Sequence, residues 1–161
     1  MDKMLNNTGA IVSGLFGAII TPAFEYFYGT GEFVKSLMTA LFFFIAMDWI
    51  SGVRAAKKDE TYASVYGIDG IFRTFFILAL PAGGHLLDKI VGAPSIAFGM
   101  LGFGVLYHVL QSMTANAIRA GWTTHVPEAI LTWLINWVKS ELEAKMARAE
   151  KRKNEKQMIK E

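Results

Sequence analysis

The stretch IVGAPSIAFGMLGFGVLYHVLQSMTANAI, from Ile90 to Ile118, is the longest part of the chain without a charged residue. It contains 29 residues between Lys89 and Arg119. A helix that crosses a membrane needs about 20 apolar residues, so this run is long enough to span a bilayer. Because the first turn of a helix tolerates proline, Pro94 can stand at its start. We therefore predict a membrane-spanning helix at about residues 94–118.

Two stretches upstream have the same character. Residues 33–53 contain SLMTALFFFIAM, which is apolar throughout and has Lys35 and Asp48 toward its ends, where charged side chains can reach the lipid headgroups. Residues 69–91 contain FFILALPAGGHLL, in which Pro81 and the two glycines after it are expected to kink or loosen a helix. These stretches predict two further spans.

The composition agrees with a membrane protein. Apolar residues make up 53% of the 161 residues and charged residues only 19%, against about 25% charged in soluble domains. There is no cysteine, which excludes disulfides and thiolate metal sites. We expect an all-α integral membrane protein with three to four transmembrane helices. Its parts would be a Gly-rich hydrophobic segment (1–30), a transmembrane core (31–120), and an amphipathic helix with a charged tail (121–161).

The N-terminal segment allows several interpretations. Residues 4–24 are uncharged, but Asn6, Asn7 and Thr8 shorten the apolar part to about 16 residues, fewer than a span needs. The segment could be a fourth span, a signal anchor, a helix in the membrane interface, or a cleaved signal peptide. Small residues recur at every fourth position, a spacing that lets helices approach closely in lipid but that can also be accidental.

The C-terminal part is different in character. Apolar residues recur at helical spacing from Ile130 to Met146, and this segment could lie in the membrane interface with its tryptophans at headgroup depth. Residues 139–161 then hold eight Lys/Arg and five Asp/Glu, so the net basic charge belongs to a tail and not to a nucleic-acid-binding surface. This tail is either a solubilising end or a binding segment.

The distribution of basic residues predicts the orientation. Lys and Arg in short loops mark the cytoplasmic side of a membrane protein. If the basic tail is cytoplasmic, three spans place the loop that carries Arg54, Lys57 and Lys58 on the same side. Lys35 and Lys89 then lie near the outer surface. We expect a multi-pass protein of a bacterial cytoplasmic membrane with a cytoplasmic C-terminus.

No catalytic or cofactor-binding motif is present. The sequence has neither a phosphate-binding Gly-x-x-x-x-Gly-Lys loop nor a His-Glu-x-x-His motif, and we expect no enzyme, no metal and no cofactor. His85 and His108 could bind a metal from two helices, but polar residues that pack inside a helix bundle explain them better. Asp48 and Arg73 are charges near the same membrane surface. They predict an intramembrane ion pair or, alternatively, part of a proton or ion relay.

Two neighbouring segments carry a resemblance. MDWISGVRAAKK (47–58) is followed by SVYGIDGIFRT (64–74), and together they resemble the phage-lysis and toxin-secretion holin family. That family has Asp-x-x-Ser/Thr-Gly at the end of one helix and Ser-x-x-Gly-x-x-Gly before the next. The matching residues here are Asp48, Ser51, Gly52, Ser64, Gly67 and Gly70. Ser112, Asn116, Gly121 and Pro127 fit a later family pattern, but Val109 and Ala115 stand where the family commonly has Glu, so no role of those acids carries over.

These motif residues also have physical roles that we predict without the resemblance. Ser51 and Gly52 can end a helix at the interface, since glycine accepts a left-handed C-cap conformation. Ser64 can cap the following helix. Gly67 and Gly70 can let that helix pack closely on a neighbour.

The resemblance implies a holin, which oligomerises in the bacterial cytoplasmic membrane and forms timed lesions. Through these a lysis enzyme (endolysin) or a toxin leaves the cell, without direct binding to the holin. Its partners would be the lipid bilayer and further copies of itself, with no nucleic acid. A lesion-lining or helix-contact stripe is predicted at Gly104, His108, Gln111, Ser112 and Asn116. The alternatives are a membrane scaffold that recruits a partner through its cytoplasmic tail, or a small ion channel.

Overall fold

The computed structural model describes residue 14 and residues 17–59 and 64–158, and this part of the chain is helical with no strand. After an N-terminal helix (residues 17–28), the elements are α2 (Glu32–Lys58), α3 (Ser64–Val91), α4 (Ile96–Ala120), the 3-10 helix η1 (Trp122–Thr124) and α5 (Glu128–Met158). The predicted all-α class is confirmed.

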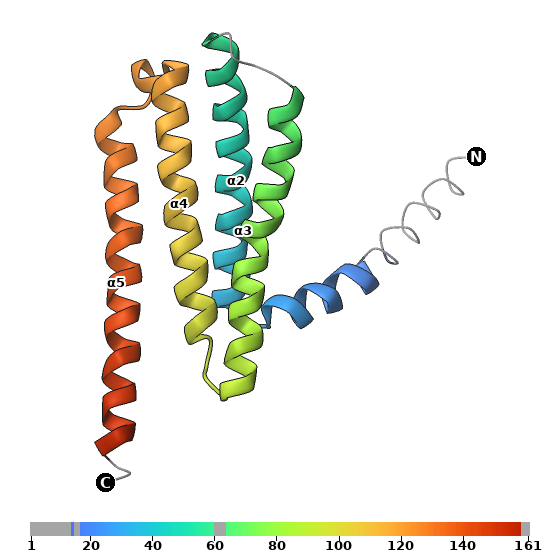
Figure 1. Cartoon of the computed structure of the whole chain (residues 1–161), viewed down its shortest axis with the longest axis vertical. Helices are drawn as coiled ribbons and strands as arrows, with labels where there is room; N and C mark the ends of the chain where they lie inside the picture. Colours follow the sequence, from blue (N-terminus) through green and yellow to red (C-terminus); the bar gives the residue numbers. More distant parts are fainter. Residues whose placement is uncertain (1–13, 15–16, 60–63, 159–161) are drawn as a thin grey trace, which may run out of the picture.

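Three of these helices are long and apolar enough to cross a membrane: α2, α3 from Ile68 onward, and α4. They lie side by side with alternating direction (Figure 1). Helix α4 is central, because it packs against α2, α3 and α5. All three spans begin or end within a few residues of the ranges that the hydropathy of the sequence predicts.

The core forms between α2 and α4. On α2 the buried side chains recur at helical spacing along one face. That face packs against the buried side of α4, which includes Phe98, Leu106 and Leu110. Gly102 of α4 lies so close to Leu37 that a Cβ atom there would approach the leucine side chain to 2.7 Å. The α2 residues of the core are Val34, Leu37, Met38, Leu41 and Ile45.

Helix α3 presents a large apolar surface to the outside. Phe72, Phe75 and Phe76 are 64–74% exposed, and Ile90 near the end of the helix is 79% exposed. Soluble monomers rarely expose a continuous apolar surface of this extent, whereas a helix in lipid requires it. The outer face of α3 is therefore the part of the bundle best suited to contact lipid chains.

The proline of α3 does not interrupt the helix, which continues through the buried Pro81 to Val91. Just beyond it, the backbone of Gly84 faces the start of α4. A Cβ atom at Gly84 would lie 2.8 Å from backbone atoms of Ala97 and Phe98, so only glycine allows this approach. The glycine after the proline thus brings α3 and α4 together.

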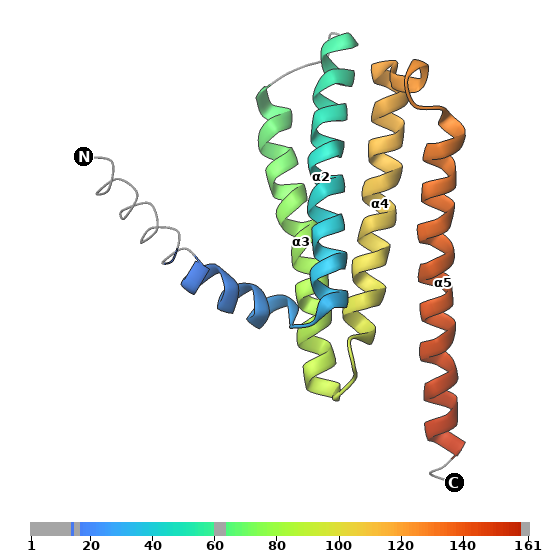
Figure 2. The ribbon, with the colours of Figure 1, turned by 180° about the vertical axis from the view of Figure 1, so that it is seen from behind.

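Helix α5 differs from the sequence prediction of an interfacial helix. It turns back at η1 and runs beside α4, on the side away from α3, as both views show (Figures 1 and 2). Val138 is 1% exposed within the core, and Leu131, Leu134 and Ile135 pack against the same core. In this arrangement the apolar residues of α5 face the side of α4.

Candidate functional site

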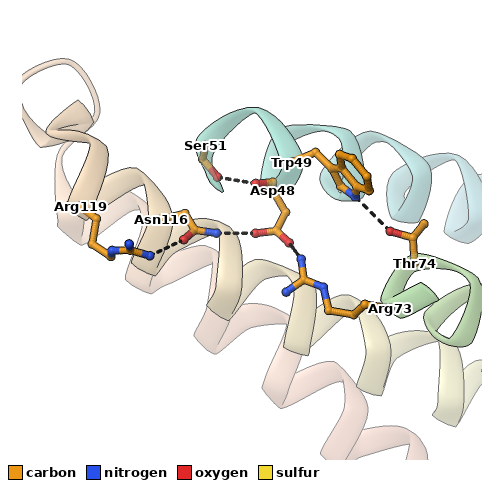
Figure 3. Close-up of polar contacts among 7 residues, drawn as sticks. All are labelled: Asp48, Trp49, Ser51, Arg73, Thr74, Asn116 and Arg119. Carbon is orange, nitrogen blue, oxygen red and sulfur yellow. Dashed lines mark hydrogen bonds and ion pairs between the residues drawn. The ribbon is translucent and has the colours of Figure 1, made fainter. Parts of the chain in front are cut away.

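Asp48 is the centre of a group of polar contacts between three helices. Its side chain lies on α2 and the residue is 4% exposed. Arg73 of α3 donates from Nη2 to Oδ2 at 2.6 Å, and Asn116 of α4 donates from Nδ2 to Oδ1 at 3.0 Å (Figure 3). A buried carboxylate needs donors of this kind, because burial of an unpaired charge is costly. The structure thus brings Asp48 and Arg73 together and adds Asn116.

The contacts continue to the surface through Arg119. Its Nη1 donates to the side-chain oxygen of Asn116 at 3.2 Å. Its Nε and Nη2 both donate to Oδ2 of Asp59, at 3.1 and 2.8 Å. Asp59 is the C-cap residue of α2, so both the interior and the end of α2 are tied to α4. We call the group of Asp48, Asp59, Arg73, Asn116 and Arg119 the polar clasp.

Ser51 and Gly52 serve this site in a way that the sequence did not predict. Helix α2 does not end at Gly52, which has no left-handed conformation, but continues to Lys58. The Ser51 hydroxyl, fully buried, donates to the carbonyl oxygen of Asp48 at 2.9 Å. A Cβ atom at Gly52 would lie 3.3 Å from the Asn116 amide. The predicted helix end is therefore wrong: the glycine makes room for Asn116, which keeps α2 and α4 close.

Gly70 packs against an aromatic ring beside the clasp. A Cβ atom at Gly70 would lie 3.2 Å from the Trp49 ring, whose Nε1 donates to Oγ1 of Thr74 at 3.0 Å. The space beside Gly70 is thus occupied by Trp49 from α2 of the same chain. Ser64 is the first residue of α3 and Gly67 lies in its first turns, but their side-chain surroundings, and the residue before Ser64, lie outside the described part.

The structure divides the predicted stripe on α4. Asn116 turns toward the clasp and Ser112 is half-buried, whereas His108 and Gln111 are exposed. A methyl group at Gly104 would meet no described atom within 4 Å. Gln111 donates to the hydroxyl of Tyr107 at 2.9 Å, one turn earlier on the same helix. So Gly104, His108 and Gln111, spaced by four and three residues, form an outward-facing polar stripe in the middle of α4.

A second polar contact, missed by the sequence analysis, holds the opposite end of the bundle. Asp88 of α3 is 4% exposed, and its two carboxylate oxygens accept the backbone N–H groups of Ala97 (2.9 Å) and Phe98 (2.8 Å). These donors belong to the first turn of α4, where no intrahelical partner exists. The sequence signal is Gly84, one turn before Asp88 on the same side of α3. From the sequence alone, this glycine indicates only a kinked or loosened helix after Pro81.

The arrangement binds the helices together. Among the residues that the structure describes, no three His, Asp or Glu side chains are grouped so that they could hold a metal. His85 lies against Gly29, whereas His108 is exposed on α4. The charges of the clasp neutralise each other at one end of the spans, and the exposed part of Arg73 can still reach lipid headgroups.

Comparisons with known proteins agree with this architecture. The sequence profile of the bacteriophage holin family matches residues 22–138, which include the three spans, both polar contacts and the first turns of α5. The uncharacterized protein Lmo0128 of Listeria monocytogenes is 34% identical over 115 residues, covering 71% of this chain and 76% of that protein. Lin0175 of Listeria innocua is 33% identical over the same shares. No solved structure matches the chain significantly.

The match covers well over half of the chain, and it includes the motif residues that build the clasp on α2 and α4. With three helices able to cross a membrane, the chain is a multi-pass membrane protein. It belongs to the bacteriophage holin family.

Proposed function

We propose that this protein oligomerises in the bacterial cytoplasmic membrane and forms timed lesions through which a lysis enzyme or a toxin leaves the cell. The observation that carries the proposal is the polar stripe of Gly104, His108 and Gln111. It lies in the middle of α4, outside the contacts of the clasp, and both polar side chains are exposed. Polar groups at the centre of a bilayer are costly when they face lipid chains, so a second copy or a water-filled lumen is the favourable neighbour.

Gly104 makes this stripe suitable for contact with a second helix. Helices in lipid associate through close packing and interhelical hydrogen bonds, because lipid chains offer no hydrophobic drive between them. A glycine with open space beside it permits a close approach, and His108 and Gln111 can then donate or accept across the contact. The same residues would line a lesion once enough copies had assembled. No covalent bond is made or broken in this process.

We also propose that the clasp end of the bundle is cytoplasmic. Arg54, Lys57 and Lys58 lie at this end, with Arg119, while Lys35 and Lys89 lie at the other. This distribution follows the positive-inside rule and supports a cytoplasmic position for the start of α5.

This orientation has a consequence for α5. Val138 packs in the core that includes Leu106 and Leu110. Lys139 follows it directly and Glu143 lies one turn further, and the charged atoms of these two residues are 4.0 Å apart. Beside α4 in a bilayer, these exposed charges would lie at the depth of the lipid chains, where each costs about 3 kcal/mol. We therefore propose that, in the membrane, α5 separates from α4 and extends into the cytoplasm.

The function is tested by induced expression in a bacterium together with an endolysin that lacks a signal peptide. We expect growth to stop abruptly after a delay, with collapse of the membrane potential and release of the endolysin to the cell wall. A membrane that stays sealed at a verified protein level would favour the scaffold alternative. Selective, discrete conductance without endolysin release would favour an ion channel.

A matched pair of glycine variants tests the stripe itself. Gly83 and Gly104 both have open space for a side chain in one protomer, but only Gly104 lies on the stripe. Gly104→Leu should insert normally and lose oligomers in membrane crosslinking, with lysis delayed or abolished. Gly83→Leu should lyse on schedule. Equal crosslinking and timing for the two variants would remove the stripe as the contact between copies.

A further inference from the structure

The N-terminal helix (residues 17–28) does not continue the direction of α2 and does not run beside the bundle. Both views show it projecting sideways from the bundle, roughly across the direction of the spans, at the end where α2 begins, opposite the clasp (Figures 1 and 2). The corner is built into the backbone, because Gly29 and Gly31 have φ angles of 89° and 107°. These are left-handed conformations that other residues rarely adopt. A fourth span packed against this bundle would need a different corner.

One side of this helix is attached to the bundle. Phe24 and Tyr28 pack against the core, with their ring centroids 5.1 Å apart. The Tyr28 hydroxyl donates to the carbonyl oxygen of Leu78 on α3 at 3.3 Å, and burial raises the pKa of this phenol above its ordinary value. Gly29 lies against the ring of His85. The helix is therefore held in its crosswise direction by side chains as well as by the corner.

A neighbouring side of the helix is apolar and exposed. Ile19, Ile20, Tyr26 and Phe27 are 48–71% exposed. At 100° per residue, Ile20 and Phe27 lie on one side of the helix and Glu25 lies on the opposite side. An apolar side with a charge across from it is the pattern of a helix in the plane of a membrane interface.

The contacts of the N-terminal helix with the ends of the spans indicate its depth in the bilayer. The helix leads through residues 29–31 into the start of α2, the end that carries Glu32 and Lys35, and its Tyr26 ring is 5.3 Å from the ammonium of Lys89 in the last turn of α3. Charged residues at the ends of spans mark the headgroup layer, and tyrosines are enriched there. A cation over an aromatic ring is favourable at this level.

We propose that residues 17–28 form an interfacial helix, which lies in the headgroup layer of the outer leaflet with Ile20 and Phe27 toward the lipid chains and Glu25 toward water. Its partner is the lipid surface of the bilayer that holds the three spans. The proposal does not depend on lesion formation, and it selects one of the four interpretations that the sequence allowed for the N-terminal segment.

The natural absence of cysteine makes depth measurements straightforward, because each variant carries a single thiol. Ile20→Cys, Phe27→Cys and Glu25→Cys are labelled with an environment-sensitive fluorophore and reconstituted in vesicles of phosphatidylethanolamine and phosphatidylglycerol. Phe43→Cys, on the exposed side of α2 within its span, is the deep reference. Quenching is compared between lipids that carry a quencher near the headgroup, lipids that carry it near the chain end, and aqueous iodide.

We expect the probes at positions 20 and 27 to report the same shallow depth, the probe at 25 to be quenched by iodide, and the probe at 43 to be quenched best by the deep lipid. In a spanning helix, seven residues correspond to a rise of about 10 Å. A depth difference of that size between positions 20 and 27 would show that the segment crosses the membrane. Strong iodide quenching at both positions would show that it is not inserted. Either result would overturn the proposal.

Discussion

The carboxylate of Asp48 and the guanidinium of Arg73 meet at 2.6 Å, although the first is buried on α2 and the second is 47% exposed on α3. The pair thus connects the interior of the bundle with its surface at one end of the spans. Asn116 completes the site from α4. Because Arg73 and Asn116 pair with the Asp48 carboxylate, its charge can be buried at this end of the bundle without remaining unpaired.

Removal of one partner of this pair should be more harmful than neutralisation of both. Breaking a buried pair costs about 3–5 kcal/mol, and the exposure of Arg73 reduces this, so we expect Arg73→Leu to lose about 2 kcal/mol of stability. The double variant Asp48→Asn with Arg73→Leu should recover part of the loss. Thermal unfolding of the detergent-solubilised protein measures both. If the losses of stability from the two single substitutions simply add in the double variant, the pair is not coupled. As a control, Lys35→Ala removes an exposed ion pair with Glu32 and should change the unfolding temperature little.

Two adjacent glycines of α3 should respond very differently to alanine. At Gly84 the new methyl group would meet the backbone of Ala97 at 2.8 Å, whereas at Gly83 it would meet no described atom within 4 Å. Gly84→Ala should therefore separate α3 from α4, loosen the Asp88 cap and destabilise the protein by about 1–3 kcal/mol. Gly83→Ala should be neutral or stabilising, since alanine favours a helix. Similar unfolding temperatures for the two variants would contradict the close approach.

The contact between Gly70 and Trp49 predicts a spectroscopic effect. Gly70→Leu should push the indole away from Thr74 and break the hydrogen bond from Nε1, because the ring already lies at the contact distance of a Cβ atom. A shift in tryptophan emission, absent when the same substitution is made in a Trp49→Phe background, measures this. Gly70→Ala should show a smaller shift, since it adds one methyl group. An unchanged emission spectrum for Gly70→Leu would place the indole elsewhere in the membrane.

The release of α5 in the membrane predicts a change in thiol accessibility. Val138→Cys is buried while α5 is docked on α4, but it should react with a membrane-impermeant thiol reagent in inside-out vesicles if α5 leaves. Lys139→Cys should react from the same side, and Leu41→Cys, within the α2–α4 core, should stay unreactive. Protection of Val138→Cys at the level of Leu41→Cys would show that α5 remains docked in the bilayer.

Several features follow from the amino-acid sequence by itself. Long apolar runs are a property of the chain and not of its packing, so the spans and their order can be read from it. Asp48 and Arg73 were expected near one membrane surface because α2 and α3 run in opposite directions and carry them toward the same end. Their residue types then made a contact favourable.

Other features depended on the rotation of each helix about its axis, which hydropathy does not specify. Only the packed bundle decides that Asn116 faces Asp48, while His108 and Gln111 face outward from the same helix. Gly52 is similar: glycine ends helices and also permits close contacts, and the neighbouring Asn116 selects the second role. The cap that Asp88 provides to α4 likewise requires two helices to be in place before its carboxylate can meet the free N–H groups. The tertiary structure decided these contacts because each joins residues whose distance is set by packing and not by their separation in the chain.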